Sequence, residues 1–198
     1  MTKYASATTR RLGMSGGLAM AVAASLTAWA PPAFSDPAPS PNATVIKVID
    51  GDTITVTSDT RGRLKVRLLG LDSPEVVKPD TPVQCFGPEA SQFAHRTLDG
   101  QRIALVSDSS QGNTDKYGRT LAFAFLPNGQ NFSVESVREG YAHAYVFNHT
   151  PSQYADQIAA AEQEARAAGR GLWSPSTCNG HAYREEASSA GPSGGGGR

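Results

Sequence analysis

Three short segments of the sequence concentrate side chains that could hydrolyse a phosphate ester. They are residues 50–53 (Asp-Gly-Asp-Thr), 67–75 and 115–119 (Asp-Lys-Tyr-Gly-Arg). Each has an ordinary explanation when taken alone, since Asp-Gly-Asp is common in tight turns and strands often end in charged residues. Together they combine carboxylates, which bind hard cations, with arginines, which bind phosphate. This combination indicates a site that cleaves phosphodiester bonds.

The chemistry suggests a role for each kind of side chain. The carboxylates of Asp52 and Asp72, with a backbone carbonyl and water molecules, suit Ca²⁺. Arg67 and Arg119 can bind a phosphate and stabilise the charge that grows as a fifth oxygen attacks. Glu75 can accept a proton from the attacking water or orient it.

This assignment requires Arg67 and Asp72 to face one cleft, although they lie five residues apart. A regular strand would send them to opposite faces, because successive side chains alternate. Gly70 lies between them and could bend or bulge the strand. We therefore expect an irregularity at Gly70.

The elements that must position these segments are mainly strands. Residues 44–49 and 53–57 are β-branched runs on either side of Asp-Gly-Asp, which predicts a hairpin. Alternating apolar and basic residues predict a third strand over 64–69, giving an antiparallel meander. Two further strands are expected over 102–106 and 120–126.

Helical spacing of apolar residues predicts helices over 88–98, 133–139 and 152–168. Gly87 is expected at the N-cap of the first helix, with Pro88 at its first position. Five strands and three helices indicate an α+β domain, and a small closed barrel capped by helices fits the strand lengths.

Charge excludes a protein that coats nucleic acid with a uniformly basic surface. The 198 residues carry 18 Lys and Arg against 18 Asp and Glu, and the first 35 residues contain three of the basic residues and no acid. Phosphate binding must therefore come from a local cluster. Six basic residues could form one lip: Arg61, Arg63, Lys65, Arg67, Lys116 and Arg119.

The two ends of the chain differ in composition from the middle. Residues 1–35 have the basic, apolar and small-residue order of a secretory signal peptide; a retained membrane anchor is the alternative. We expect a linker over 36–42, one domain over 43–183 and a disordered Gly/Ser-rich tail over 184–198. The mature protein is then expected to be secreted, monomeric and without stable membrane association.

Four motifs in this order resemble those of the staphylococcal nuclease family: residues 44–53, 66–75, 86–91 and 114–119. The likeness runs from about residue 43 to 173. It implies an OB-fold, that is, a five-stranded barrel with about three helices. It also implies a calcium-dependent endonuclease that acts on DNA and RNA, breaks the 5′ O–P bond and leaves 3′-phosphate ends.

The resemblance also assigns site residues. The positions that match the family's catalytic residues are Arg67, Glu75 and Arg119. The positions that match its calcium ligands are Asp52, Asp72 and Ser73. Ser73 stands where the family often has threonine and is expected to contribute its main-chain carbonyl. The positions that match its contacts to the nucleotide are Lys116, Tyr117, Tyr145 and Phe147. Phe147 replaces a tyrosine, so that a hydroxyl is lost there.

The chain has two cysteines, Cys85 and Cys178. In an exported protein the simplest interpretation is one disulfide, and two free buried thiols are the alternative.

Two other functions remain open at this point. One is a non-catalytic OB-fold module that binds nucleic acid, and the other is an exported phosphodiesterase that acts on small nucleotides. The first predicts substitution of a metal-binding aspartate, a catalytic arginine or the glutamate, and all five of these residues are present: Asp52, Asp72, Arg67, Arg119 and Glu75.

Overall fold

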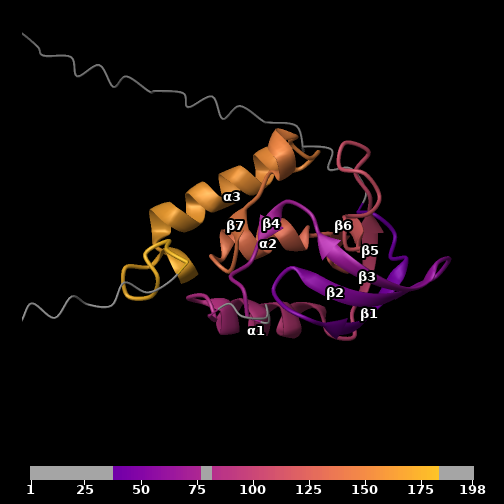
Figure 1. The fold of residues 1–198 in the computed structure, drawn as a ribbon, viewed down its shortest axis with the longest axis horizontal. Coiled ribbons are helices and arrows are strands. Elements are labelled where there is room, and N and C mark those ends of the chain that lie inside the picture. The colour runs from indigo at the N-terminus through magenta and orange to yellow at the C-terminus, as the bar shows by residue number, and fades with distance from the viewer. Residues whose placement is uncertain (1–37, 77–81, 183–198) are drawn as a thin grey trace, which may run out of the picture. The chain divides into compact units, whose positions relative to one another are not determined.

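The computed structural model describes residues 38–76 and 82–182, in which five strands close into a barrel. The order around the barrel is β1-β2-β3-β6-β5, and three α-helices pack beside it (Figure 1). The strands of the barrel are β1 (Ala43–Val48), β2 (Thr53–Ser58), β3 (Gly62–Leu68), β5 (Arg102–Val106) and β6 (Thr120–Phe125). This is the expected α+β fold of the OB type.

The barrel is closed by one parallel pair of strands. The meander β1-β2-β3 is antiparallel, as the sequence predicted, and so are the pairs β5–β6 and β1–β5. Strand β3 then pairs in parallel with β6, with Val66 opposite Thr120 and Arg67 opposite Leu121. This closure places the last three residues of β3 beside the first three of β6, directly after the loop that carries Arg119.

The helices begin close to where the sequence predicted. They are α1 (Gly87–Leu98), α2 (Phe132–Arg138) and α3 (Ala155–Ala168). The expected cap of α1 was wrong by one residue, because Phe86 is the N-cap and Gly87 already belongs to the helix. The start expected for α3 was three residues too early. The core between barrel and helices includes fully buried Phe123, Phe132, Leu71 and Ile158.

Short elements complete the described chain. A two-stranded sheet joins β4 (Leu71–Asp72) to β7 (His143–Ala144), and two 3₁₀ turns, η1 (Phe147–His149) and η2 (Gly171–Trp173), flank α3. The sequence patterns predicted none of these. Within the described residues, no helix combines the length and the apolar character needed to cross a membrane.

Gly70 forms the bend that the sequence required. Its φ is +80°, and a Cβ at this position would lie 2.3 Å from Cδ1 of Ile158. Only glycine adopts such a backbone conformation without cost, and only a residue without a side chain fits beneath α3. The chain therefore turns between β3 and β4, and the expected irregularity at Gly70 is confirmed.

We expect Gly70→Ala to lower the free energy of unfolding by about 2–4 kcal/mol, from overpacking together with the strain of a positive φ. Urea denaturation measures this loss. Gly100→Ala is the matched control, because Gly100 also has a positive φ (+70°) but a Cβ there would have no other atom within 4 Å. Equal losses in the two variants would show that contact with Ile158 has no part in the effect.

Both cysteines form one disulfide. The bond joins Cys85, in the loop before α1, to Cys178, in the segment after η2, with a Cα–Cα distance of 5.8 Å. The expected bridge is therefore present, and the alternative of two free thiols is wrong. The main chain reinforces the link, because the Cys85 N–H donates to the Ala182 carbonyl at 2.8 Å.

Candidate active site

A continuous network of polar contacts joins residues from all three segments that the sequence singled out. The guanidinium Nη2 of Arg67 lies 3.2 Å from Asp52 Oδ2 and 3.1 Å from Asp72 Oδ1. The Thr53 hydroxyl donates to Asp52 Oδ1 at 2.9 Å and accepts from Arg119 Nη1 at 3.3 Å. The Arg67 guanidinium group therefore links Asp52 to Asp72, and the Thr53 hydroxyl links Asp52 to Arg119.

The barrel and the bend explain why these side chains meet. Thr53 begins β2 directly opposite Arg67 of β3, so Asp52 lies at the same end of the barrel. Arg67 Nη1 donates to the carbonyl oxygens of Leu68 and Leu71, at 2.8 and 3.0 Å. The guanidinium group thus spans the turn at Gly70 and reaches Asp72 on its far side.

Asp115 holds Arg119 in place. Its Oδ2 accepts from Arg119 Nε at 2.6 Å, and its Oδ1 accepts from the main-chain N–H groups of Tyr117 and Arg119. Burial alone would raise the pKa of Asp115, but these hydrogen bonds and the arginine hold it below its ordinary value. Asp115 therefore stays ionised and orients Arg119. The signal for this role was an acid four residues before an arginine in a glycine-containing turn.

Glu75 is held through its main chain. Its N–H donates to Gln84 Oε1 at 2.8 Å, and its carbonyl accepts from the Gln84 N–H at 2.9 Å. Its side-chain Oε1 accepts from the Val76 N–H at 3.0 Å. Gln84, which the sequence analysis did not single out, thus ties Glu75 to the loop that carries the disulfide.

Neighbouring carboxylates of the site influence each other's pKa. Burial, with the neighbouring charge of Asp52, raises the pKa of Asp50 to about 6. Burial also raises the pKa of Asp72; the charges of Asp52 and Glu75 act in the same direction, and Arg67 acts against them. The negative charges of Asp52 and Glu75 thus oppose ionisation of their neighbours Asp50 and Asp72, and a bound cation would relieve this repulsion.

The donor atoms fit a hard cation such as Ca²⁺, because they are carboxylate oxygens. Ser73 lies against this group, and its N–H and hydroxyl each donate to Asp52 Oδ2 at 3.2 Å. Across residues 38–76 and 82–182, no three His, Cys, Asp or Glu side chains form a group able to hold a metal ion by themselves. A bound ion would therefore need main-chain oxygen or water in addition to the aspartates.

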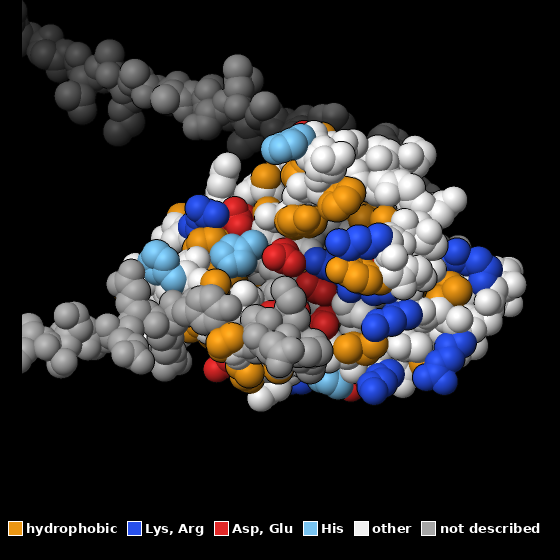
Figure 2. All heavy atoms as spheres, viewed as in Figure 1, with side chains coloured by type: hydrophobic (Ala, Val, Ile, Leu, Met, Phe, Trp, Pro, Cys, Tyr) orange, Lys and Arg blue, Asp and Glu red, His pale blue; other side chains and the backbone are white. Residues whose placement is uncertain are grey.

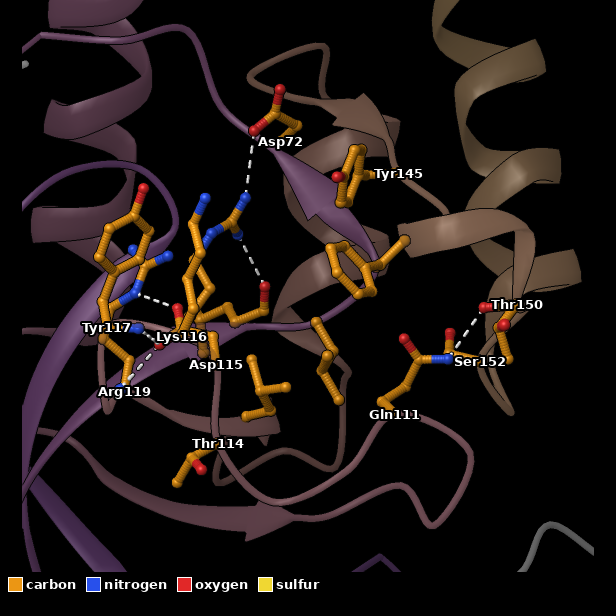
Figure 3. Close-up of a pocket in the computed structure, with 16 residues that line it drawn as sticks. Asp72, Gln111, Thr114, Asp115, Lys116, Tyr117, Arg119, Tyr145, Thr150 and Ser152 are labelled. Atoms are coloured by element: carbon orange, nitrogen blue, oxygen red, sulfur yellow. Dashed lines mark hydrogen bonds and ion pairs between the residues drawn. The ribbon is translucent and has the colours of Figure 1, made fainter.

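A pocket of about 450 Å³ opens beside the network (Figure 3). Seven of the residues singled out by the sequence line it: Arg67, Asp72, Lys116, Tyr117, Arg119, Tyr145 and Phe147. The other three do not: Asp52 is 7% exposed, Ser73 lines a neighbouring cavity of about 190 Å³ that also reaches Asp72, and Glu75 lines neither.

The rim of the pocket is aromatic and basic. Tyr117 and Phe147 are 72% and 61% exposed, and Tyr145 is 45% exposed. Tyr117 and Tyr145 come from separate loops and lie well apart in Figure 3. Figure 2 shows acidic side chains near the centre of the visible face, with Lys and Arg side chains beside them. Such a rim offers flat surfaces for bases and cations for phosphates.

Comparison with known proteins places the chain in one family. The family model described as "Staphylococcal nuclease homologue" matches residues 65–175, which is more than half of the chain. The chain belongs to the staphylococcal nuclease family. The matched range includes Arg67, Asp72, Glu75 and Arg119, whereas Asp52 precedes it.

Similar proteins of the staphylococcal nuclease family include two thermonucleases. That of Staphylococcus hyicus is 41% identical over 130 residues, which cover 66% of this chain and 74% of the relative. That of Staphylococcus intermedius is 42% identical over 129 residues, covering 65% and 74%. Endonuclease YncB of Bacillus subtilis is 35% identical over 136 residues, covering 68% and 63%.

Proposed function

We propose that this chain is a secreted, calcium-dependent endonuclease that cuts DNA and RNA at the 5′ O–P bond and leaves 3′-phosphate ends. The broad class follows from membership of the staphylococcal nuclease family, which makes the chain a nuclease and hence a phosphodiester hydrolase. The finer statement rests on the family resemblance and on one observation: Arg67, Asp52, Thr53 and Arg119 form a continuous network beside an open pocket.

Each side chain has a proposed part in cleavage. Arg67 and Arg119 bind the scissile phosphate and take up the negative charge of the transition state, since guanidinium groups stay protonated and donate in a rigid plane. Glu75 accepts a proton from the attacking water or orients it. Asp52, Asp72 and the Ser73 carbonyl would hold Ca²⁺, which when bound supplies Lewis-acid polarisation of a phosphate oxygen.

The rim of the pocket would bind the nucleotide. Lys116 contributes charge, and its Nζ lies 5.1 Å from the centre of the Tyr117 ring. Tyr117, Tyr145 and Phe147 offer exposed aromatic faces on which bases can stack, and stacking tolerates any base. Because Phe147 has no hydroxyl, we expect the missing hydrogen bond to affect base preference more than the rate of cleavage.

We propose secretion as a single folded domain, with residues 1–35 removed as a signal peptide and residues 36–42 acting as a linker. The Cys85–Cys178 disulfide is compatible with an oxidising compartment. The proposed signal peptide and the proposed disordered tail, residues 184–198, lie outside the described residues. We propose a monomer without stable membrane association.

We expect Arg119→Ala to lower kcat about a hundredfold or more, because one donor to the transition state is lost. Arg119→Lys should recover little, since lysine cannot donate two parallel hydrogen bonds. Arg102→Ala is the control: Arg102 pairs with Asp59 at 2.6 Å, as Arg119 pairs with Asp115, but it does not line the pocket. Full activity in Arg119→Ala, measured under saturating substrate, would remove Arg119 from the mechanism.

One assay tests the proposal as a whole: digestion of plasmid DNA, RNA and a dinucleotide with Ca²⁺, with Mg²⁺ and with a chelator. We expect both polymers to be cut with Ca²⁺ and left intact with the chelator. Retention of uncut nucleic acid with Ca²⁺ would indicate the non-catalytic module instead. Equal rates on the dinucleotide and the polymers would indicate a phosphodiesterase for small nucleotides.

A further inference from the structure

We propose that the outward face of β3 binds the phosphate backbone of an extended nucleic acid strand that continues beyond the pocket. We name this surface the β3 track and define it as Arg63 and Lys65 of β3 together with Arg61, which lies in the turn directly before the strand. The inference rests on the proposed function, because it extends the substrate from a nucleotide in the pocket to a single strand that crosses the barrel.

The track leads directly into the site. Arg63, Lys65 and Arg67 occupy alternate positions of β3, while Val66 and Leu68 between and after them are buried. Alternate side chains of a strand share one face and advance about 6.8 Å per pair of residues. This spacing is comparable to that of successive phosphates in an extended strand. Arg67 is the last cation of the row and already lines the pocket.

The neighbouring positions of β2 are uncharged. Across the β2–β3 pair, Thr57 lies opposite Arg63, Thr55 opposite Lys65 and Thr53 opposite Arg67. Of these threonines only Thr57 is exposed, while Thr53 and Thr55 are buried. On the far side of β2, Lys47 of β1 is paired with Thr55, which adds a cation beside the track. This row of paired positions contains no carboxylate that would repel a phosphate.

The cations of the track are available for a ligand. Arg61, Arg63 and Lys65 are exposed, and none forms an ion pair with a carboxylate within residues 38–76 and 82–182. The acid of the same hairpin, Asp59, instead accepts two hydrogen bonds from Arg102, at 2.7 and 2.6 Å. Figure 2 shows Lys and Arg side chains over the part of the face that Figure 1 assigns to β1, β2 and β3.

Two structural explanations compete with binding of a polyanion. Charged residues often protect the edge of a sheet from pairing, and β3 pairs with β6 only over Val66–Leu68, so the salt slopes below must decide between edge protection and phosphate binding for Arg63 and Lys65. A generally basic composition would also place cations here by chance, but residues 36–198 carry 15 basic against 18 acidic side chains. Binding of a polyanion accounts for three unpaired cations in one row.

The triple variant Arg61→Gln, Arg63→Gln and Lys65→Gln tests the track. We expect kcat/KM on single-stranded DNA at 0.1 M salt to fall between about tenfold and a hundredfold, with cleavage of a dinucleotide unchanged. The slope of log K against log salt, measured by equilibrium binding of a single-stranded oligonucleotide, should become shallower by about 2, because each contact to a single strand contributes about 0.7.

Arg63→Gln alone and Arg166→Gln form a matched pair, since each removes one positive charge. Arg166 lies on α3, pairs with Glu162 and stacks over Trp173 at 4.0 Å. Only Arg63→Gln should make the slope shallower, by about 0.7. An unchanged slope in the triple variant, equal slopes in the matched pair, or an equal loss on the dinucleotide would each overturn the track.

The binding measurement also separates this inference from the proposed function. If the unaltered chain cuts neither polymer nor dinucleotide with Ca²⁺, the proposed function fails. Oligonucleotide binding needs no cleavage, so the comparison of salt slopes decides on the track in that case too.

Discussion

Replacement of Glu75 by glutamine is expected to lower kcat on single-stranded DNA between about a hundredfold and ten-thousandfold. That is the usual contribution of a positioned general base, and an amide can neither accept the proton of the attacking water nor carry its charge. Single-turnover cleavage at saturating Ca²⁺ and substrate measures the chemical step directly. A kcat within a few-fold of the unaltered chain would exclude Glu75 as base or as the group that orients the water.

Glutamine preserves the main-chain contacts of Glu75. Both hydrogen bonds to Gln84 use main-chain atoms, and glutamine keeps a side-chain oxygen that can accept from the Val76 N–H as Oε1 does. Glu89→Gln is a suitable control, because Glu89 is exposed in the first turn of α1 and lines neither cavity. Calcium affinity should be measured in parallel. A loss that disappears at high Ca²⁺ would assign Glu75 to metal binding rather than to proton transfer.

Removal of the disulfide is expected to cost about 4–5 kcal/mol of unfolding free energy in a Cys85→Ser, Cys178→Ser variant. The bridge closes a loop between residues 93 positions apart, and the loss of chain entropy in the unfolded state grows with the length of the loop. Guanidinium unfolding measures the change. Because typical domains are stable by about 5–15 kcal/mol, the variant should be only marginally folded at about 37 °C.

Two comparisons make the disulfide prediction sharper. The unaltered chain with a reductant should unfold at the same denaturant concentration as the serine variant, because both lack the covalent link. The Cys85 N–H bond to Ala182 involves only the main chain and can survive in either. If the variant unfolds with the unaltered oxidised chain, the bridge adds no stability and the segments it joins are held by other contacts.

Local patterns allowed much of the fold to be predicted. The β-branched runs around Asp-Gly-Asp gave the first hairpin, and the spacing of Arg67 and Asp72 required the bend that Gly70 forms. The β3–β6 pairing was not predictable in this way, because Val66 and Thr120 lie far apart in the chain and no pattern records their register. The two-residue strands β4 and β7 are too short to show a periodicity.

The candidate site was predictable only in part, for a related reason. Residue type and spacing point to groups that could bind phosphate or a metal, such as Arg67 and Asp72. Gln84 and Asp115 act instead by hydrogen bonding to other residues of the site. A glutamine or an aspartate in a loop has many possible partners, and only the folded chain selects one.

The parallel pairing of β3 with β6 has a consequence for how activity is acquired. Three residue pairs form this seam: Val66 with Thr120, Arg67 with Leu121, and Leu68 with Ala122. Arg67 lies in this seam and Arg119 directly precedes it, so separation of β3 from β6 would move the two arginines apart. Contacts between distant parts of a chain form slowly. During refolding, the ability to cleave nucleic acid should therefore return only when the barrel closes. A fragment that ends before β6 should have no cleavage activity.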